Sequence, residues 1–408
     1  MANQDLNTVE IMFEEFTKAV DLETTISKKA TKFFPKPKEM ERAADTYYVR
    51  QELMLTTIEN TFDISASAKS DIIDRAIPIT FRNPDNVLYE LTAKEMRDPE
   101  QMKNAGKAAA KKLAQTIDRI LYQTVAQQAS VVIKKVGAFS WDDGALAEAG
   151  LIQRGFGSSD LSMFMNATDY LAVAKDLGNR AYLGDRSKDA YERSKVPDIA
   201  NFQTFRTGNQ YNLAAVGTVT GTTVSGAQSF TPTAMTGAVP TDNRQMTLVV
   251  AGANIANTKV GDAFTIAGVY AVHQSDKSDT GILQTFRILS GQGTANLVIT
   301  PAIVATGPYQ NVTAAAGGGA AITFLNTVTK PVNVFWTEGA VCLDYGMLEF
   351  PSGYGPQVMR STTDQGVPLQ VSMLFNHLTG KMEIRNHVMF AATVRERDQA
   401  GIIIANQT

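Results

Sequence analysis

The chain has 408 residues, enough for two or three domains, and 44% of them are hydrophobic, which is ample for buried cores. A formal net charge of −3 excludes a nucleic-acid-binding protein whose affinity depends on bulk positive charge. The single cysteine, Cys342, excludes an intrachain disulfide, and no apolar run approaches the roughly 20 residues that a membrane span needs.

The N-terminal residues combine an acidic helix with a basic strap. A capping box that starts at Asn7 predicts a short amphipathic helix over 7–20, with Phe13 and Phe16 on its apolar face. Five lysines and no acid follow at 28–38, where two prolines favour extended chain. This pattern is typical of a segment that reaches a neighbour, and a solvated terminus explains it equally well.

Residues 45–82 are predicted to form a long β-hairpin. Its returning arm alternates, so that three apolar side chains share one face: Ile77, Ile79 and Phe81. Pro78 between them favours an edge strand. Because a hairpin of this length cannot bury itself, we expect it to lie on another surface.

Residues 98–130 are predicted to form one long helix, with Asp98 as its N-cap and Pro99 at its first position. Apolar residues recur along it in steps of three and four. Gly106 costs about 1 kcal/mol relative to alanine in a helix, which indicates close packing there. Three lysines fall on the opposite face: Lys103, Lys107 and Lys111. A solvated face is the ordinary explanation of this row, and a face toward nucleic acid is the alternative.

The stretch 131–214 is predicted to be an α/β layer. The expected elements are a strand at 131–136, a helix at 141–154 capped by Asp142 or Asp143, a buried strand at 161–166, a helix at 167–179 and a brief polar helix at 187–194. The composition then changes, because residues 215–332 hold nine charged side chains and no glutamate. Short strand patterns separated by glycine and proline turns predict an inserted antiparallel β domain, either a barrel or a sandwich.

The motifs of the common catalytic sites are missing from the sequence. It has no phosphate-binding loop, no GxGxxG that opens a helix and no GxSxG elbow. None of the three histidines, His273, His377 and His387, lies at metal-ligand spacing from another ligand. We therefore expect no catalytic residue, no cofactor site and no metal site, and we do not expect an enzyme.

Several motifs resemble the coat proteins of the phage P22-like family, a branch of the HK97-type capsid fold. They are PDN at 84–86, MRD at 96–98, TTVSGAQSFTP at 222–232, DNR at 242–244, KVGDAFTIAGV at 259–269 and VNVFWTEGAV at 332–341. The resemblance covers essentially the whole chain and implies an α+β fold. It divides the chain into an N-terminal arm (1–44), an extended loop (45–82), a spine helix with a peripheral domain (83–136), the first part of an axial domain (137–214), an inserted β-barrel domain (215–332) and closing axial and peripheral β elements (333–408).

The resemblance also implies a function. The expected function is that of a major capsid protein, which assembles into the icosahedral shell around the double-stranded DNA of a tailed phage. The implied partners are copies of the chain in hexamers and pentamers, a scaffolding protein, a portal and non-specifically held DNA, and no membrane is expected. Assembly would take place in the host cytoplasm, and the product would be the virion capsid. The alternatives are a non-viral encapsulating shell of the same fold and, in a different class, an adhesin or enzyme with a β module.

From the resemblance we expect two groups of functional residues. The candidate contacts between subunits are Phe13, Phe16, Ile77, Ile79, Phe81, Asp242 and Arg244. The candidate residues facing the lumen are Lys103, Lys107 and Lys111. The family's inserted domain carries a long acidic loop that bridges subunits, whereas the corresponding span MTGAVPTDNR is short here and has one acid. Asp242 and Arg244 are the remaining candidates for an ion pair in that loop.

Overall fold

The computed structural model describes residues 2–33, 46–57, 62–63, 65, 72–92, 94–95, 98–157, 160–179, 196–348, 357–363 and 365–408. The chain forms two compact units. The first comprises Met1–Tyr47, Ile79–Tyr122 and Cys342–Thr393, and the second comprises Tyr48–Pro78, Gln123–Val341 and Val394–Thr408. Each unit therefore gathers segments that lie far apart in the sequence.

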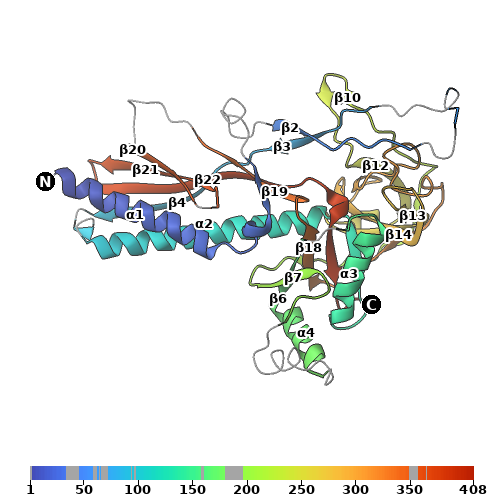
Figure 1. The fold of residues 1–408 in the computed structure, drawn as a ribbon, viewed down its shortest axis with the longest axis horizontal. Helices are drawn as coiled ribbons and strands as arrows, with labels where there is room; N and C mark the ends of the chain where they lie inside the picture. Colours follow the sequence, from blue (N-terminus) through green and yellow to red (C-terminus); the bar gives the residue numbers. More distant parts are fainter. Residues whose placement is uncertain are drawn as a thin grey trace. The chain divides into compact units, whose positions relative to one another are not determined.

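The first unit packs helices alongside a mixed sheet (Figure 1). Its helical elements are α1 (Ala2–Glu23), the turn η1 (Ser27–Lys29) and the part of α2 (Pro99–Gln128) up to Tyr122. The sheet has the strand order β1-β19-β22-β21-β20, and β4 also pairs with β22. These strands are β1 (Thr31–Phe33), β4 (Asp85–Thr92), β19 (Val341–Gly346), β20 (Gln357–Thr362), β21 (Pro368–Asn376) and β22 (Lys381–Val394).

The two helices of this unit are in close contact. A Cβ atom built on Gly106 of α2 would lie 2.7 Å from the backbone oxygen of Met12 in α1, so only glycine fits there. This contact confirms the close packing predicted at Gly106. The N-cap of α2 is also confirmed, since Oδ1 of Asp98 accepts the backbone N–H of Glu100 at 3.0 Å. Helix α1 is longer than predicted: it begins at Ala2, so Asn7 lies inside the helix instead of capping it.

The predicted hairpin at 45–82 forms short strands only. They are β2 (Thr46–Arg50) and β3 (Ala76–Thr80), which make a two-stranded sheet. The backbone N–H of Gln51 still donates to the oxygen of Arg75, but the described residues beyond this bond are not in strands. A proline at position 78 of β3 suits a sheet of two strands, because both strands are edges.

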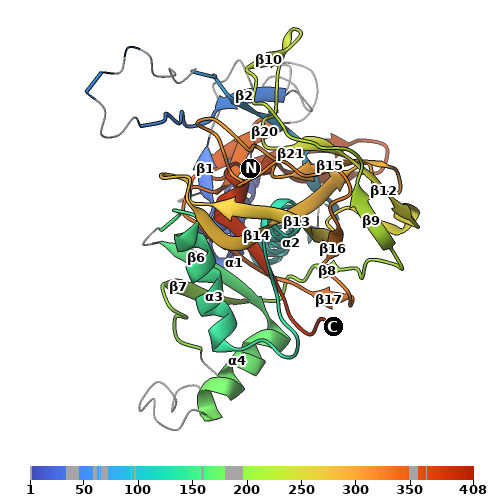
Figure 2. The ribbon, with the colours of Figure 1, turned by 90° about the vertical axis from the view of Figure 1, so that its right-hand side faces the viewer.

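The second unit contains a five-stranded mixed sheet with the order β5-β23-β18-β6-β7. Its strands are β5 (Val131–Lys134), β6 (Leu161–Asn166), β7 (Phe202–Thr207), β18 (Asn333–Thr337) and β23 (Ala400–Ile404). Helices α3 (Trp141–Gln153) and α4 (Ala167–Asn179) pack on it, and Figure 2 shows both beside β6 and β7. Ser140 caps α3 and Asp143 completes its capping box, which corrects the predicted cap at Asp142 or Asp143. The polar helix predicted at 187–194 lies outside the described residues.

The insertion forms the predicted antiparallel β domain. Its main sheet has the order β16-β13-β14-β15-β12-β9, with β9 (Thr220–Val224), β12 (Met246–Ala253), β13 (Ala263–Val272), β14 (Asp279–Ser290), β15 (Asn296–Thr300) and β16 (Ile322–Phe324). The two end strands also meet. Thr223 pairs with Ala321, and the backbone N–H of Val224 donates to the oxygen of Ala320 at 3.0 Å. The sheet thus closes on itself as a barrel around an apolar core that includes Phe264 and Phe286.

Short strands flank this barrel. They are β8 (Asn212–Leu213) and β17 (Lys330–Pro331), which pair with each other, and β10 (Met235–Thr236) and β11 (Val239–Pro240), which form a small hairpin. The short helical turn η4 (Ile255–Asn257) follows β12, and the turn η5 (Arg397–Gln399) precedes β23. The β8–β17 pair joins the two ends of the insertion, and Val332 donates its N–H to the oxygen of Tyr211 at 3.1 Å.

Candidate functional site

The described residues hold no cluster of three or more side chains that could bind a metal ion. His273 lies 2.9 Å from Asp276 in an exposed turn, and His377 lies in the turn between β21 and β22. His387 is buried in β22, where its Nε2 is 2.7 Å from Oε1 of Gln370. In these contacts, none of the three described histidines lies beside both a nucleophile and an acid.

The environment of His387 leads to a prediction about pH. Burial, together with the positive charge of Arg385, lowers the pKa of His387 to about 4. Below pH 6.5 the unfolded chain takes up a proton that the folded chain cannot accept, so stability falls between pH 6.5 and 4. We expect His387→Gln to abolish about 2–3 kcal/mol of this loss, measured by urea denaturation at several pH values. His377→Gln is the control, and an unchanged pH profile in His387→Gln would contradict the assignment.

Asp242 and Arg244 form the predicted ion pair, but they form it within one chain. Arg244 donates from Nε to Oδ1 and from Nη2 to Oδ2 of Asp242, both at 2.8 Å, and both side chains are about nine-tenths buried. The Nη1 of Arg244 donates to the backbone oxygen of Val394 at 2.7 Å. Burial alone would raise the pKa of Asp242, but the hydrogen bonds and the charge of Arg244 outweigh it, and the pKa lies below its usual value. The pair therefore fastens the barrel to the end of β22.

Arg287 is a second buried cation that joins the barrel to its surroundings. Its Nε donates to the oxygen of Gly261 at 2.8 Å, and its Nη2 donates to the oxygen of Ala126 in the last turn of α2. The last carbonyls of a helix have no partner within the helix, and a cation is favoured there. Sequence reasoning missed this residue. A charge between apolar residues of the strand pattern ILQTFRIL, in a segment with few charges, was the available signal.

Asp118 holds the segment after α1 against α2. This buried carboxylate accepts the backbone N–H groups of Thr25, Ile26 and Ser27 at 2.9–3.2 Å, and also the Thr25 hydroxyl at 3.1 Å. Four donors on one carboxylate make a compact anchor, because hydrogen bonds to a charged acceptor are about twice as strong as neutral ones. Sequence reasoning missed Asp118, although an acid beside the apolar stripe of α2 was visible.

The apolar residues expected at subunit contacts are buried within the chain. Phe13 and Phe16 stack on one another in α1, and Phe81 stacks on Tyr47 with ring centroids 5.6 Å apart. Five side chains are at most 7% exposed: Phe13, Phe16, Ile77, Ile79 and Phe81. Each therefore packs against residues of its own chain, and its part in a contact between subunits stays a prediction.

The three lysines of α2 do not share one environment. Lys107 lies 3.6 Å from Glu15 of α1, and Lys103 contributes to lowering the pKa of Glu14, after Lys18. Lys111 is exposed. Two of the three lysines therefore lie close to acids of α1. The prediction of a solvated face did not include these contacts.

The segment between β2 and β3 exposes large apolar side chains. They are Leu53, Leu55, Phe62 and Ile72. Phe62 is fully exposed and Leu55 is 65% exposed, whereas single subunits ordinarily avoid contiguous apolar patches. Contacts at its base hold this segment to other parts of the second unit: Gln51 donates to Glu396, and the hydroxyl of Tyr309 donates to the oxygen of Ile73 at 3.2 Å. An anchored segment with uncovered apolar side chains is suited to contact a neighbouring molecule.

These features define a class of protein. An arm helix, an exposed loop, a long spine helix, a mixed-sheet domain and an inserted barrel are the parts of an HK97-type capsid subunit. Residues 1–405 match the family model described as P22 coat protein, gene protein 5, and the chain belongs to this family. It is a structural major capsid protein of tailed phages, which assembles into the shell of the virion.

Solved structures of capsids resemble this chain. The capsid protein of Cyanophage P-SCSP1u is 10% identical, with a TM-score of 0.48, and the match covers 94% of this chain and 89% of that one. The mature capsid protein of bacteriophage PhiM1 is 7% identical, with a TM-score of 0.47, and the match covers 94% and 88%. The CUS-3 coat protein I-domain is 42% identical, with a TM-score of 0.22, and the match covers 27% of this chain and 99% of that domain. Among the described residues, no helix is long and apolar enough to cross a bilayer.

Proposed function

We propose that the chain forms hexamers and pentamers of an icosahedral shell, in which the segment between β2 and β3 lies on a neighbouring copy. The exposed apolar side chains of this segment carry the proposal. Leu53 and Leu55 are more than half exposed, and covering them is favourable by roughly 25 cal/mol per Å² of apolar surface removed from water. In a closed shell, every subunit has a neighbouring copy that can cover these side chains.

The remaining parts of the proposal concern partners. A scaffolding protein sets the size of the shell, a portal occupies one vertex, and assembly takes place in the host cytoplasm. The shell holds double-stranded DNA without sequence preference and catalyses no reaction. The near-neutral chain, with a net charge of −3, supports weak and non-specific contact with DNA. Lys111, which is exposed on α2, is a candidate for such contact.

A variant of the exposed segment tests the shell contact. We expect Leu55→Asp to abolish closed particles or to reduce their yield at least tenfold, because the variant would bury an unpaired carboxylate at every contact between copies. Assembly is measured by sedimentation and negative-stain images of the purified chain with and without its scaffolding protein. Leu55→Met, which keeps the apolar surface, is the matched control.

A loss of particles in Leu55→Asp would report on assembly, because the substitution should not affect the folding of the monomer. Leu55 is 65% exposed in the subunit, so Leu55→Asp should melt as a monomer within about 0.5 kcal/mol of the unchanged chain. Particles of normal size and yield from Leu55→Asp would show that this face stays in solvent, and the proposed contact would have to be abandoned.

A further inference from the structure

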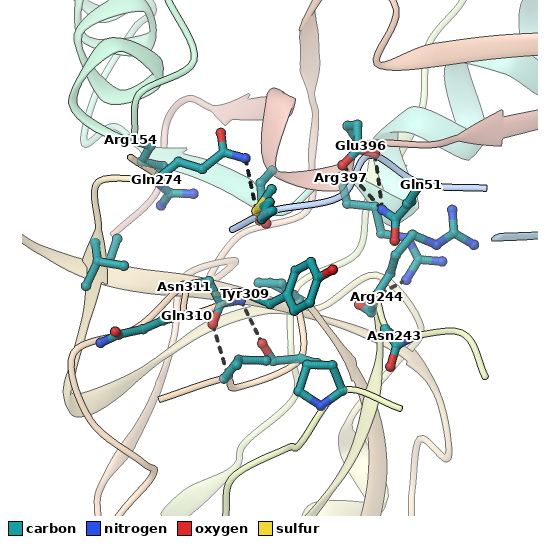
Figure 3. Close-up of a pocket in the computed structure, with 18 of the residues that line it drawn as sticks. Gln51, Arg154, Asn243, Arg244, Gln274, Tyr309, Gln310, Asn311, Glu396 and Arg397 are labelled. Carbon is teal, nitrogen blue, oxygen red and sulfur yellow. Dashed lines mark hydrogen bonds between the residues drawn. The ribbon is translucent and has the colours of Figure 1, made fainter. Parts of the chain in front are cut away.

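The segment between β2 and β3 meets the barrel at the loop base (residues 51–55 and 72–75), which lies within the second unit together with the barrel. A cavity of about 100 Å³ separates the two there (Figure 3). Its lining includes Gln51, Met54 and Arg75 from the loop base and Tyr309 from the barrel. Where the cavity lies, the two parts do not pack directly, so the contacts at its rim hold the loop base in place.

Tyr309 holds the returning arm of the loop base. It is 6% exposed and belongs to the apolar core of the barrel. Its hydroxyl donates to the backbone oxygen of Ile73 at 3.2 Å, and the guanidinium carbon of Arg75 lies 4.0 Å from the centroid of its ring. The Nη2 of Arg75 donates in turn to the backbone oxygen of Glu52 at 2.9 Å, which joins the returning arm to the outgoing arm. One residue of the barrel therefore restrains both arms.

The barrel fixes the position of Tyr309 through Asn311. The Oδ1 of Asn311 accepts the backbone N–H of Val304 at 3.0 Å, and its Nδ2 donates to the backbone oxygen of Ala302 at 2.7 Å (Figure 3). The backbone N–H of Asn311 also donates to the oxygen of Val304 at 3.0 Å. These three bonds close the stretch of the barrel that carries Tyr309, so its place does not depend on the loop base.

The outgoing arm is held at two points. The side-chain amide of Gln51 donates to Glu396 in the turn after β22 at 3.1 Å (Figure 3). The side-chain amide of Gln274, which follows β13 of the barrel, donates to the Sδ of Met54 at 3.5 Å. Met54 also packs against the apolar core of the barrel. Apolar packing and a weak hydrogen bond thus hold the same side chain to the barrel.

The exposure of the outgoing arm alternates around Met54. Leu53 is 51% exposed and Leu55 is 65% exposed, whereas Met54 between them is half-buried. In extended chain, successive side chains point to opposite sides. A contact that holds Met54 against the barrel therefore turns both leucines away from it.

We propose that the barrel presents the segment between β2 and β3 to the neighbouring copy. Tyr309 and Gln274 are positioning residues, which fix the loop base with Met54 inward and hold Leu53 and Leu55 outward before contact. This inference rests on the contact between copies proposed above. Ordering a flexible segment opposes association, so a segment that is ordered in advance lets subunits assemble at a lower concentration.

The reactivity of an introduced cysteine in the full-length, unassembled chain tests the orientation of the loop base. The native Cys342 is 1% exposed, so the introduced thiol should dominate the reaction with a water-soluble maleimide. We expect Met54→Cys to react roughly tenfold more slowly than Leu55→Cys, because the thiol at position 54 becomes accessible only when the loop base opens. Adding Tyr309→Phe, which removes the bond to the backbone of the returning arm, should speed the reaction of Met54→Cys roughly 3–10-fold and leave that of Leu55→Cys unchanged.

Assembly of the chain that carries Tyr309→Phe alone tests the consequence. We expect the chain concentration at half-maximal assembly to rise roughly 3–10-fold. Tyr270→Phe, which removes a hydroxyl from an exposed tyrosine in β13 of the same barrel, is the matched control and should change neither the reaction rates nor assembly.

Three results would overturn the inference. Equal reaction rates of Met54→Cys and Leu55→Cys, or a rate of Met54→Cys that Tyr309→Phe does not change, would show that the barrel does not orient the loop base. Both results leave the contact between copies standing, since Leu55→Asp tests that contact separately. A faster reaction of Met54→Cys together with unchanged assembly of Tyr309→Phe would show that the orientation does not serve assembly. Normal assembly of Leu55→Asp would instead remove the contact on which the inference rests.

Discussion

Asp118→Asn is expected to lower the free energy of unfolding by about 2–4 kcal/mol. The carboxylate accepts four hydrogen bonds from Thr25, Ile26 and Ser27 and is buried, so three backbone N–H groups depend on it. Asparagine has one neutral oxygen, which can keep the three bonds to the Oδ2 position more weakly, and its amide nitrogen would face the Ser27 N–H, which cannot accept a hydrogen bond. The variant should also release α1, which would be seen as faster proteolysis within residues 2–33.

The measurement is chemical denaturation of the monomer together with limited proteolysis. Arg119→Gln, at the next position and exposed, is the control for a loss of charge on α2 and should change stability by less than about 0.5 kcal/mol. Equal stability and equal proteolysis in Asp118→Asn would mean that the segment after α1 is held by other contacts.

The second large effect is expected at the ion pair of the barrel. Arg244→Met should cost about 3–5 kcal/mol, because it leaves the carboxylate of Asp242 buried without its bidentate partner. It also removes the donor to the oxygen of Val394. Arg397, whose Nη2 lies 3.9 Å from Asp242, can recover a part of this loss. The melting temperature of the monomer and denaturation in urea measure the effect.

The double variant Asp242→Asn with Arg244→Met separates the charge from the packing. It leaves no unpaired carboxylate, so we expect it to regain more than half of the stability lost in Arg244→Met alone. If the double variant is as unstable as the single one, the loss comes from the bond to Val394 and from packing, and the ion pair contributes little.

Local patterns in the sequence were sufficient to predict most helices and strands. The N-cap at Asp98 and the close contact at Gly106 were both predicted, because each depends on the residue itself and on its place in a helix. The strands of the barrel were predicted from alternation and turn residues. Strands β12, β13, β14, β15 and β16 coincide, in this order, with the patterns QMTLVV, DAFTIAGVYAV, ILQTFRIL, ANLVIT and AAITFL. The family resemblance then predicted the order of the parts.

What the sequence did not predict depends on residues far apart in the chain. The closure of β9 on β16 and the contact of Arg287 with Ala126 each join positions about a hundred residues or more apart. Asp242 and Arg244, two residues apart, were predicted as a pair, but their burial beneath the end of β22 was not. Periodicity reports which face is apolar, and it carries no information on which segment covers that face.

The pairing of β8 with β17 has a consequence for the order in which the chain folds. Strands β7 and β18 flank the insertion, and bringing them together in an unfolded chain closes a loop of roughly 120 residues. Once the barrel has formed, Tyr211 and Val332 are already in contact, so the same step closes a loop of only a few residues. The difference in loop-closure entropy is about 3 kcal/mol. A barrel that folds early would therefore speed the formation of the five-stranded sheet, although none of its residues belongs to that sheet.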